Sequence, residues 1–185
     1  MVNKILFDTK YLQLKETPSK NGNSWYYAHR PNAENVVVIV PVVGEDVLFL
    51  IEERPPIIAE GKGKYSVGLP AGLVGDERKG ESTMDAIKAE LLEEAGLSAD
   101  TVKICAKKVA SSSGCLSETC TIAIAYLKDK NIVAEPLNDG GIIVDRVWVR
   151  KDEIRDWLKR MEDKGYVISA HTLAGLFYIF MEDKL

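Results

Sequence analysis

The chain has 185 residues, of which 46% are hydrophobic and 28% charged, so it can bury a core of its own. Its net charge of −4 argues against nonspecific binding to nucleic acid or to an anionic membrane. The N-terminal apolar run is too short for a signal peptide and is interrupted by Asp8, and no segment reaches the ~20 apolar residues of a membrane span. We therefore expect a cytoplasmic protein with no nucleic-acid partner and no membrane partner.

The N-terminal part of the chain is predicted to be rich in strands. Strands are expected at 4–15 and 24–30, joined through a turn at Asn21-Gly22-Asn23. Val36 to Val43 is a continuous apolar run, typical of a strand buried on both faces, and should pair in a hairpin with 47–53. Residues 55–65, rich in Pro, Gly and Lys, are predicted to form an exposed loop.

A helix is predicted at about 82–95. Ser82, followed three residues later by Asp85, marks its start, and Gly96 stands where a left-handed C-terminal cap belongs. Its predicted apolar stripe consists of Met84, Ile87, Leu91 and Ala95.

The remaining elements are three strands followed by two helices. The strands are expected at 102–110, 120–127 and 142–149, and the helices at 152–163 and 169–181. The last helix is predicted to bury Leu173, Leu176, Phe177 and Phe180. Mixed strands around a central helix, with helices at the end of the chain, predict an α/β/α sandwich.

Three glutamates, Glu90, Glu93 and Glu94, share one face of the central helix. At about 100° per residue they lie within an arc of roughly 100°. Neighbouring like charges destabilise a helix, and this face offers no basic side chain to neutralise them. A hard divalent cation, magnesium or manganese, would account for the cluster. A solvated acidic face is the alternative interpretation.

The segment from Gly75 to Leu97, G-x5-E-x7-A-E-L-L-E-E-A-G-L, resembles the Nudix box, G-x5-E-x7-R-E-U-x-E-E-x-G-U with U aliphatic. Ala89, which replaces the box arginine, is the one departure at a fixed position. The resemblance implies a Nudix α/β/α sandwich with a mixed sheet at 36–185, and N-terminal strands at 1–35 used for dimerisation and base binding.

The flanking sequence resembles the ADP-ribose and nucleotide-sugar pyrophosphatase branch of that superfamily. Leu69-Pro70-Ala71-Gly72-Leu73 precedes the box as in those enzymes. The resemblance implies that the Ala71 carbonyl joins Glu90 and Glu94 as a metal ligand, while Glu93 completes the cluster or orients a water molecule. An ordinary strand-to-loop turn is the alternative for Ala71.

The same branch implies residues that bind the substrate. Arg54 matches an arginine that contacts phosphate, a task suited to its planar fork of donors. Trp25 and Arg30 match an aromatic residue and an arginine on strands that relatives exchange across a homodimer, where the aromatic ring stacks on adenine. Tyr11 falls where some relatives carry a second stacking ring. Packing within a dimer core is the alternative for Trp25 and the tyrosines.

Two further departures concern loops. Residues 112–118 resemble Ser-Pro-Gly-x-x-Ser/Asp-Glu, with Ser113 in place of the proline that marks the ADP-ribose branch. Its Glu118 is a candidate substrate contact or auxiliary base, or else a solvated loop charge. The slot for the catalytic loop glutamate of relatives holds Gly141. The residues that could take over as base are Asp139, Glu135, Glu93 and Glu118.

Together these features imply a magnesium-dependent pyrophosphohydrolase that acts on a nucleoside diphosphate linked to another moiety. ADP-ribose, cleaved to AMP and ribose 5-phosphate, is the leading substrate, and a GDP-sugar or another nucleotide sugar is the alternative. A degenerate Nudix domain that senses a nucleotide without hydrolysing it is favoured by Ala89 and Gly141. Retention of all three glutamates favours the enzyme.

Overall fold

The computed structural model describes residues 3–75, 80–136 and 142–182. Its strands are β1 (Lys4–Asp8), β2 (Gln13–Pro18), β3 (Ser24–His29), β4 (Asn35–Val43), β5 (Asp46–Glu52), β6 (Ser66–Gly68), β7 (Ala71–Val74), β8 (Thr101–Ala110), β9 (Thr119–Tyr126), β10 (Ile143–Arg150) and β11 (Val167–Ile168). Its helices are α1 (Pro55–Ala59), α2 (Thr83–Ala95), the 3-10 turn η1 (Lys151–Glu153), α3 (Ile154–Asp163) and α4 (Ala170–Glu182).

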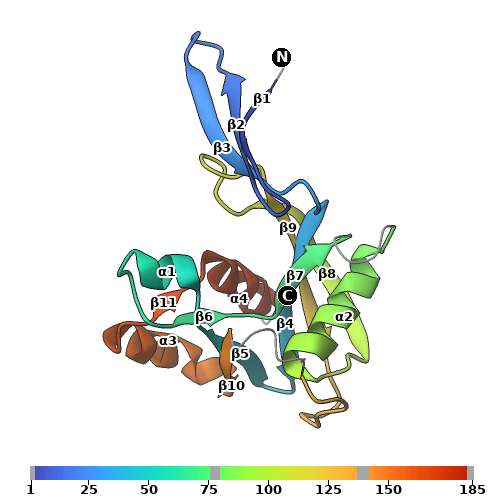
Figure 1. Ribbon diagram of the computed structural model, residues 1–185. Coiled ribbons are helices and arrows are strands. Elements are labelled where there is room, and N and C mark those ends of the chain that lie inside the picture. Colours follow the sequence, from blue (N-terminus) through green and yellow to red (C-terminus); the bar gives the residue numbers. More distant parts are fainter. Residues whose placement is uncertain (1–2, 76–79, 137–141, 183–185) are drawn as a thin grey trace.

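A mixed eight-stranded sheet forms the centre of the fold. Its strands run in the order β11-β6-β5-β4-β9-β8, with β10 paired to β5 and β7 paired to β4. The β4–β9 and β11–β6 pairs are parallel and the other pairs are antiparallel. Helix α2 packs on one face, and α3 and α4 pack on the other (Figure 1). The predicted α/β sandwich is confirmed.

Strand β4 shows why an uninterrupted apolar run is needed at the centre of this sheet. Val36, Val38 and Val40 belong to the core cluster shared with α3 and α4. Val37 and Ile39, which point to the other side, belong to the cluster beneath α2. Because successive side chains of a strand alternate between faces, a strand with a layer on each side must be apolar throughout.

The N-terminal residues form a separate three-stranded antiparallel sheet, β1-β2-β3, that extends away from the central sheet (Figure 1). The prediction of one strand over 4–15 was wrong, because a turn divides it. The Thr9 hydroxyl accepts from the Leu12 amide at 2.8 Å and donates to the Leu12 carbonyl at 2.7 Å. This side-chain contact supplies the turn with bonds that a continuous strand would make along its ladder.

Helix α2 begins and ends where predicted. The Ser82 hydroxyl accepts from the Asp85 amide at 3.1 Å, and Gly96 adopts a left-handed φ of 70°. Its buried residues are Ala86, Ile87, Leu91 and Ala95, whereas Met84 is only half-buried. The loop expected at 55–65 was wrong at its start, since it opens with the short helix α1, in which proline fits the first turn.

The C-terminal helices cover the second face of the sheet, but the predicted apolar face of α4 was wrong in part. Leu176 is buried, together with Ile179, whereas Leu173, Phe177 and Phe180 are 54%, 56% and 39% exposed. The reason is Gly175, where an added β-carbon would lie 2.8 Å from Leu69. The helix approaches the sheet most closely along its smallest residue, which rotates the larger side chains outward. No helix in the described ranges has the length and apolar character required to cross a membrane.

Candidate functional site

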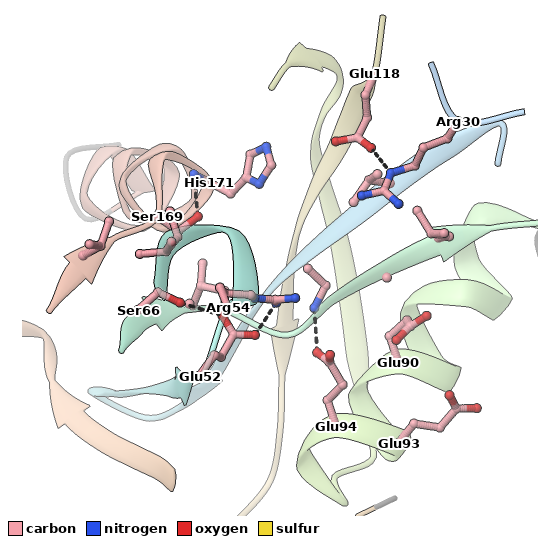
Figure 2. Close-up of a pocket in the computed structure, with 18 residues that line it drawn as sticks. Arg30, Glu52, Arg54, Ser66, Glu90, Glu93, Glu94, Glu118, Ser169 and His171 are labelled. Carbon is pink, nitrogen blue, oxygen red and sulfur yellow. Dashed lines mark hydrogen bonds and ion pairs between the residues drawn. The ribbon is translucent and has the colours of Figure 1, made fainter. Parts of the chain in front are cut away.

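One cavity of about 660 Å³ lies at the edge of the central sheet, within the size range of small-molecule sites. Helix α2 supplies one wall, the start of α4 lies across from it, and the ends of β5 and β7 lie between them (Figure 2). Seven residues selected from the sequence line this cavity: Arg30, Arg54, Ala71, Glu90, Glu93, Glu94 and Glu118.

The wall of the cavity that α2 supplies, with Glu90, Glu93 and Glu94, packs directly against β7. The Ala71 amide donates to Glu94 Oε2 at 2.8 Å, which holds this carboxylate beside the backbone of the predicted carbonyl ligand. Gly72 has no side chain at the point where the Glu90 carboxylate lies, and an added β-carbon there would overlap that carboxylate. The glycine is therefore required for α2 and β7 to bring their oxygen atoms together.

An arginine on β10, Arg146, contacts the C-terminal end of α2. Arg146 Nε donates to the Glu94 backbone carbonyl at 2.6 Å. An arginine at the C-terminal turn satisfies a carbonyl that lacks a partner within the helix and complements the helix dipole. This contact could not be predicted from the sequence, because Arg146 is 52 residues away from Glu94.

The residues around Gly72 suit a hard divalent cation by their chemistry. The carboxylates of Glu90 and Glu94 and the backbone carbonyl of Ala71 are oxygen donors, and the Glu90 carboxylate lies directly against Gly72. Within the described ranges, no three Asp, Glu, His or Cys side chains are grouped closely enough to hold one ion. Two carboxylates with the Ala71 carbonyl therefore remain the candidate ligand set.

The structure describes some of the residues that the sequence offers as candidate bases. The Gly141 slot and Asp139 lie outside the described residues. Glu135 is exposed and is not among the residues that line the cavity, whereas Glu93 and Glu118 both line it.

Sequence reasoning missed Glu52, a carboxylate buried at the end of β5. It is 3% exposed, forms an ion pair with Arg54 and lies 3.5 Å from the Ser66 hydroxyl. Burial raises its pKa, and Arg54 opposes this only in part. A β-carbon on Gly68 would collide with it, so the strand next to it leaves room for this acid. The available signal was a charged residue directly after the apolar run from Val47 to Ile51.

A second ion pair lies on the opposite side of the cavity, between Arg30 and Glu118. Arg30 Nε donates to Glu118 Oε2 at 2.7 Å, and the Ser111 hydroxyl donates to Glu118 Oε1 at 2.9 Å. Ser169 and His171, at the start of α4, also line the cavity. These two residues were not singled out from the sequence, since they belong to no motif there.

The two predicted stacking aromatics do not line the cavity of their own chain. Trp25 is 53% exposed, and its indole nitrogen donates to the Gly114 carbonyl at 2.9 Å. Tyr11 is 63% exposed in the turn between β1 and β2, with Lys10 Nζ 5.1 Å from its ring centroid. Trp25 lies on β3 and contacts the loop at 111–118, whereas the side chain of Tyr11, in the turn between β1 and β2, is exposed to solvent.

Comparisons with known proteins support the architecture. No family model and no curated protein matches the chain. Among solved structures, the crystal structure of an ADP compounds hydrolase is similar, with a TM-score of 0.73 and 21% sequence identity. The match covers 100% of this chain and 92% of the other. At this identity the likeness shows a shared fold.

Proposed function

We propose that the protein hydrolyses the pyrophosphate bond of a nucleoside diphosphate derivative, with ADP-ribose as the leading substrate and AMP and ribose 5-phosphate as products. One observation carries this proposal: a single cavity joins three glutamates of α2 to two arginines from other elements. Acidic and basic groups on facing walls are what a metal-bound diphosphate requires. The solved ADP compounds hydrolase with the same fold supports the substrate class.

The metal would be magnesium, with manganese as the alternative. Glu90, Glu94 and the Ala71 carbonyl would hold it, and when bound it would polarise the phosphoryl oxygens and lower the pKa of an attacking water. Glu93, from the same helix, would complete the cluster or orient that water. The Ala71 amide keeps Glu94 against β7, so the helix presents its carboxylates from a fixed wall.

The two arginines would hold the diphosphate. Arg54 and Arg30 lie in different parts of the cavity lining, and each is paired with a carboxylate, Glu52 or Glu118. A pre-oriented guanidinium loses little freedom when it binds phosphate, which favours both binding and positioning. Trp25 and Tyr11 would reach a base only if a second copy of the chain brings its N-terminal sheet to this cavity.

Two alternatives remain. A GDP-sugar or another nucleotide sugar would use the same chemistry with a different base or sugar. A nucleotide sensor is favoured by Ala89 in place of the box arginine. The sensor would bind nucleotide in this cavity without turnover.

The proposal is tested by a hydrolysis screen of nucleoside diphosphate derivatives with magnesium, in which released monophosphates are detected. We expect turnover of ADP-ribose, or of a nucleotide sugar, that requires the metal. Glu162→Gln neutralises an exposed glutamate on α3 that does not line the cavity. It is the control for general charge effects when a glutamate of α2 is replaced by glutamine. Binding of nucleotides without turnover of any would replace the hydrolase by the sensor.

A further inference from the structure

Four polar side chains, His171, Ser111, Glu118 and Arg30, form a continuous series of contacts along the rim of the cavity. We call this series the relay. His171 Nε2 lies 3.1 Å from the Ser111 hydroxyl, which lies 2.9 Å from Glu118 Oε1. The other carboxylate oxygen, Oε2, accepts from Arg30 Nε at 2.7 Å. The relay therefore runs from α4, through both ends of the loop at 111–118, to the residue that follows β3. Three of its four members line the cavity.

The hydrogen bonds of the relay allow only one arrangement of its protons. An ionised carboxylate accepts hydrogen bonds and donates none, so the single hydroxyl proton of Ser111 points to Glu118. The Ser111 oxygen can then only accept from His171, which must carry its proton on Nε2. Burial lowers the pKa of His171, although Glu118 opposes the shift, so the neutral ring with Nε2–H is the form expected near neutral pH.

The consequence for Arg30 is a fixed orientation. Glu118 engages Nε, which leaves the two terminal nitrogens of the guanidinium free of this pairing and able to donate into the cavity. Both oxygens of Glu118 already accept a hydrogen bond, from Ser111 and Arg30. This arrangement suits a carboxylate that holds an arginine better than one that removes a proton from water.

The N-terminal sheet meets the central domain at the same loop. The Ala28 amide donates to the Cys115 carbonyl at 2.8 Å, and the Ser117 amide donates to the Ala28 carbonyl at 3.1 Å. These backbone bonds hold the strand that leads to Arg30, and the side-chain relay holds the guanidinium itself. The end of the loop opposite β3 is anchored to α4 through His171.

We propose that His171 and Ser111 are positioning residues that hold Glu118, and through it the guanidinium of Arg30, in the wall of the cavity. That Arg30 then meets a substrate diphosphate rests on the proposed function; the relay itself does not. The relay is therefore tested first without substrate, and its effect on turnover afterwards.

The first test is NMR of the histidine rings and the arginine Nε–H groups in the intact protein. The chain has only two histidines, so His29→Gln assigns the ring signals. We expect His171 to carry its proton on Nε2 and Arg30 Nε–H to exchange slowly. His171→Leu and Ser111→Ala should each speed that exchange roughly threefold or more, because each removes one hydrogen bond of the relay. His171→Gln, whose amide nitrogen can replace Nε2–H, should restore slow exchange.

Two results would overturn the relay. One is a His171 ring protonated on Nδ1 alone. The other is an Arg30 Nε–H exchange rate that stays at the parent value in both His171→Leu and Ser111→Ala. Thermal unfolding of each variant shows whether the fold is retained, and His171→Gln separates loss of the hydrogen bond from loss of the ring.

The second test measures steady-state kinetics on the best substrate of the hydrolysis screen. His171→Leu should raise KM about three- to tenfold with kcat within about twofold, and the double variant with Ser111→Ala should be no worse than either single variant. Additive losses, or a KM that does not change, would reject the positioning role. If the parent protein hydrolyses no nucleotide derivative, the proposed function fails, and the NMR result alone decides the relay.

Discussion

Glu94 is the residue at which metal binding and packing can be separated most cleanly. Its Oε2 accepts from the Ala71 amide, and glutamine keeps an oxygen acceptor of the same shape while losing the charge. Loss of residues that only support a ligand already costs 10–100-fold, so we expect Glu94→Gln to lower turnover by about a hundredfold or more and to weaken magnesium binding. Magnesium titrations of turnover, with thermal unfolding as control, test this. Parent-like activity would remove Glu94 from the ligand set.

Ala89 stands where the Nudix box, which this segment resembles, has an arginine, and its effect on turnover can be tested by restoring that arginine. An arginine at 89 would lie one turn before Glu93, where it could pair with that carboxylate and fix the glutamate face. A charged hydrogen bond is worth about 1.5–3 kcal/mol, so Ala89→Arg could raise turnover roughly tenfold or more. The measurement is kcat at saturating magnesium on the best substrate.

The opposite outcome for Ala89→Arg has a specific structural cause. Arg146 already donates to the Glu94 carbonyl, so a cation from β10 stabilises the same end of α2. Lys88 is exposed, and Arg78 lies outside the described residues. If Arg146 has taken over the task, the new arginine will leave turnover level or lower it. Activity that falls while metal affinity is retained would reject the first explanation and leave the hydrolase proposal intact.

Glu52 connects the stability of the protein to pH. Its pKa is raised by burial, so its ionised form is less favourable in the folded protein than in the unfolded chain. The stability that it contributes is therefore full below the ordinary glutamate pKa and is lost as pH rises through the raised value. Glu52→Gln cannot titrate, so as pH rises above the ordinary glutamate pKa its unfolding free energy should fall less, or rise more, than that of the parent. Urea unfolding at several pH values tests this, and parallel curves would contradict it.

The contact between β7 and α2 gives a prediction about two elements rather than one side chain. Gly72 has no positive φ, so alanine suits its backbone, but the added β-carbon would displace the Glu90 carboxylate. That carboxylate ends a flexible side chain, so we expect Gly72→Ala to change the melting temperature little. Because a displacement of about 1 Å can cost a hundredfold in rate, turnover should fall strongly. Gly114→Ala, which meets open space without a positive φ, is the matched control; equal loss in both would refute the explanation.

Elements with strong local signals could be predicted from the sequence. Helix α2 carries its own caps, and β4 contains an unbroken apolar run from Val36 to Val43, so each is recognisable without its neighbours. The short strands β6, β7 and β11 are defined by pairing with distant partners, which no local pattern encodes. The exposed face of α4 escaped prediction for the same reason, since the close approach at Gly175 depends on Leu69 and Val40.

The candidate site follows the same division. The three glutamates on one face of α2 could be predicted from helical spacing, whereas residues 69–73 before them were identified only through their resemblance to the segment that precedes the Nudix box. Glu52, Arg146 and His171 could not, because each reaches its partner only after the sheet has formed. Of these three, only Glu52 carries a local signal, since it is the acidic residue that directly follows the apolar run from Val47 to Ile51 in β5.

As a whole molecule, one copy of the chain leaves much of its apolar surface in water. The N-terminal sheet exposes Phe7 at 64%, Trp25 at 53% and, on the same three strands, Ile5, Leu14 and Tyr26. Exposed apolar side chains gathered on one small sheet are typical of an interface. Because the sheet extends away from the central domain (Figure 1), a second copy is well placed to cover it.

We therefore predict a homodimer built on the N-terminal sheets, with a mass in light scattering of about twice the 20.5 kDa of the chain. Phe7→Glu places a charge in the proposed interface and should shift the mass toward the monomer at micromolar concentration. Val144→Glu, at another exposed apolar position but on β10, is the control that should leave the dimer intact. A 20.5 kDa particle for the parent protein would contradict the dimer. Trp25 would then have no neighbouring cavity to enter, and base stacking by it would fall with the dimer.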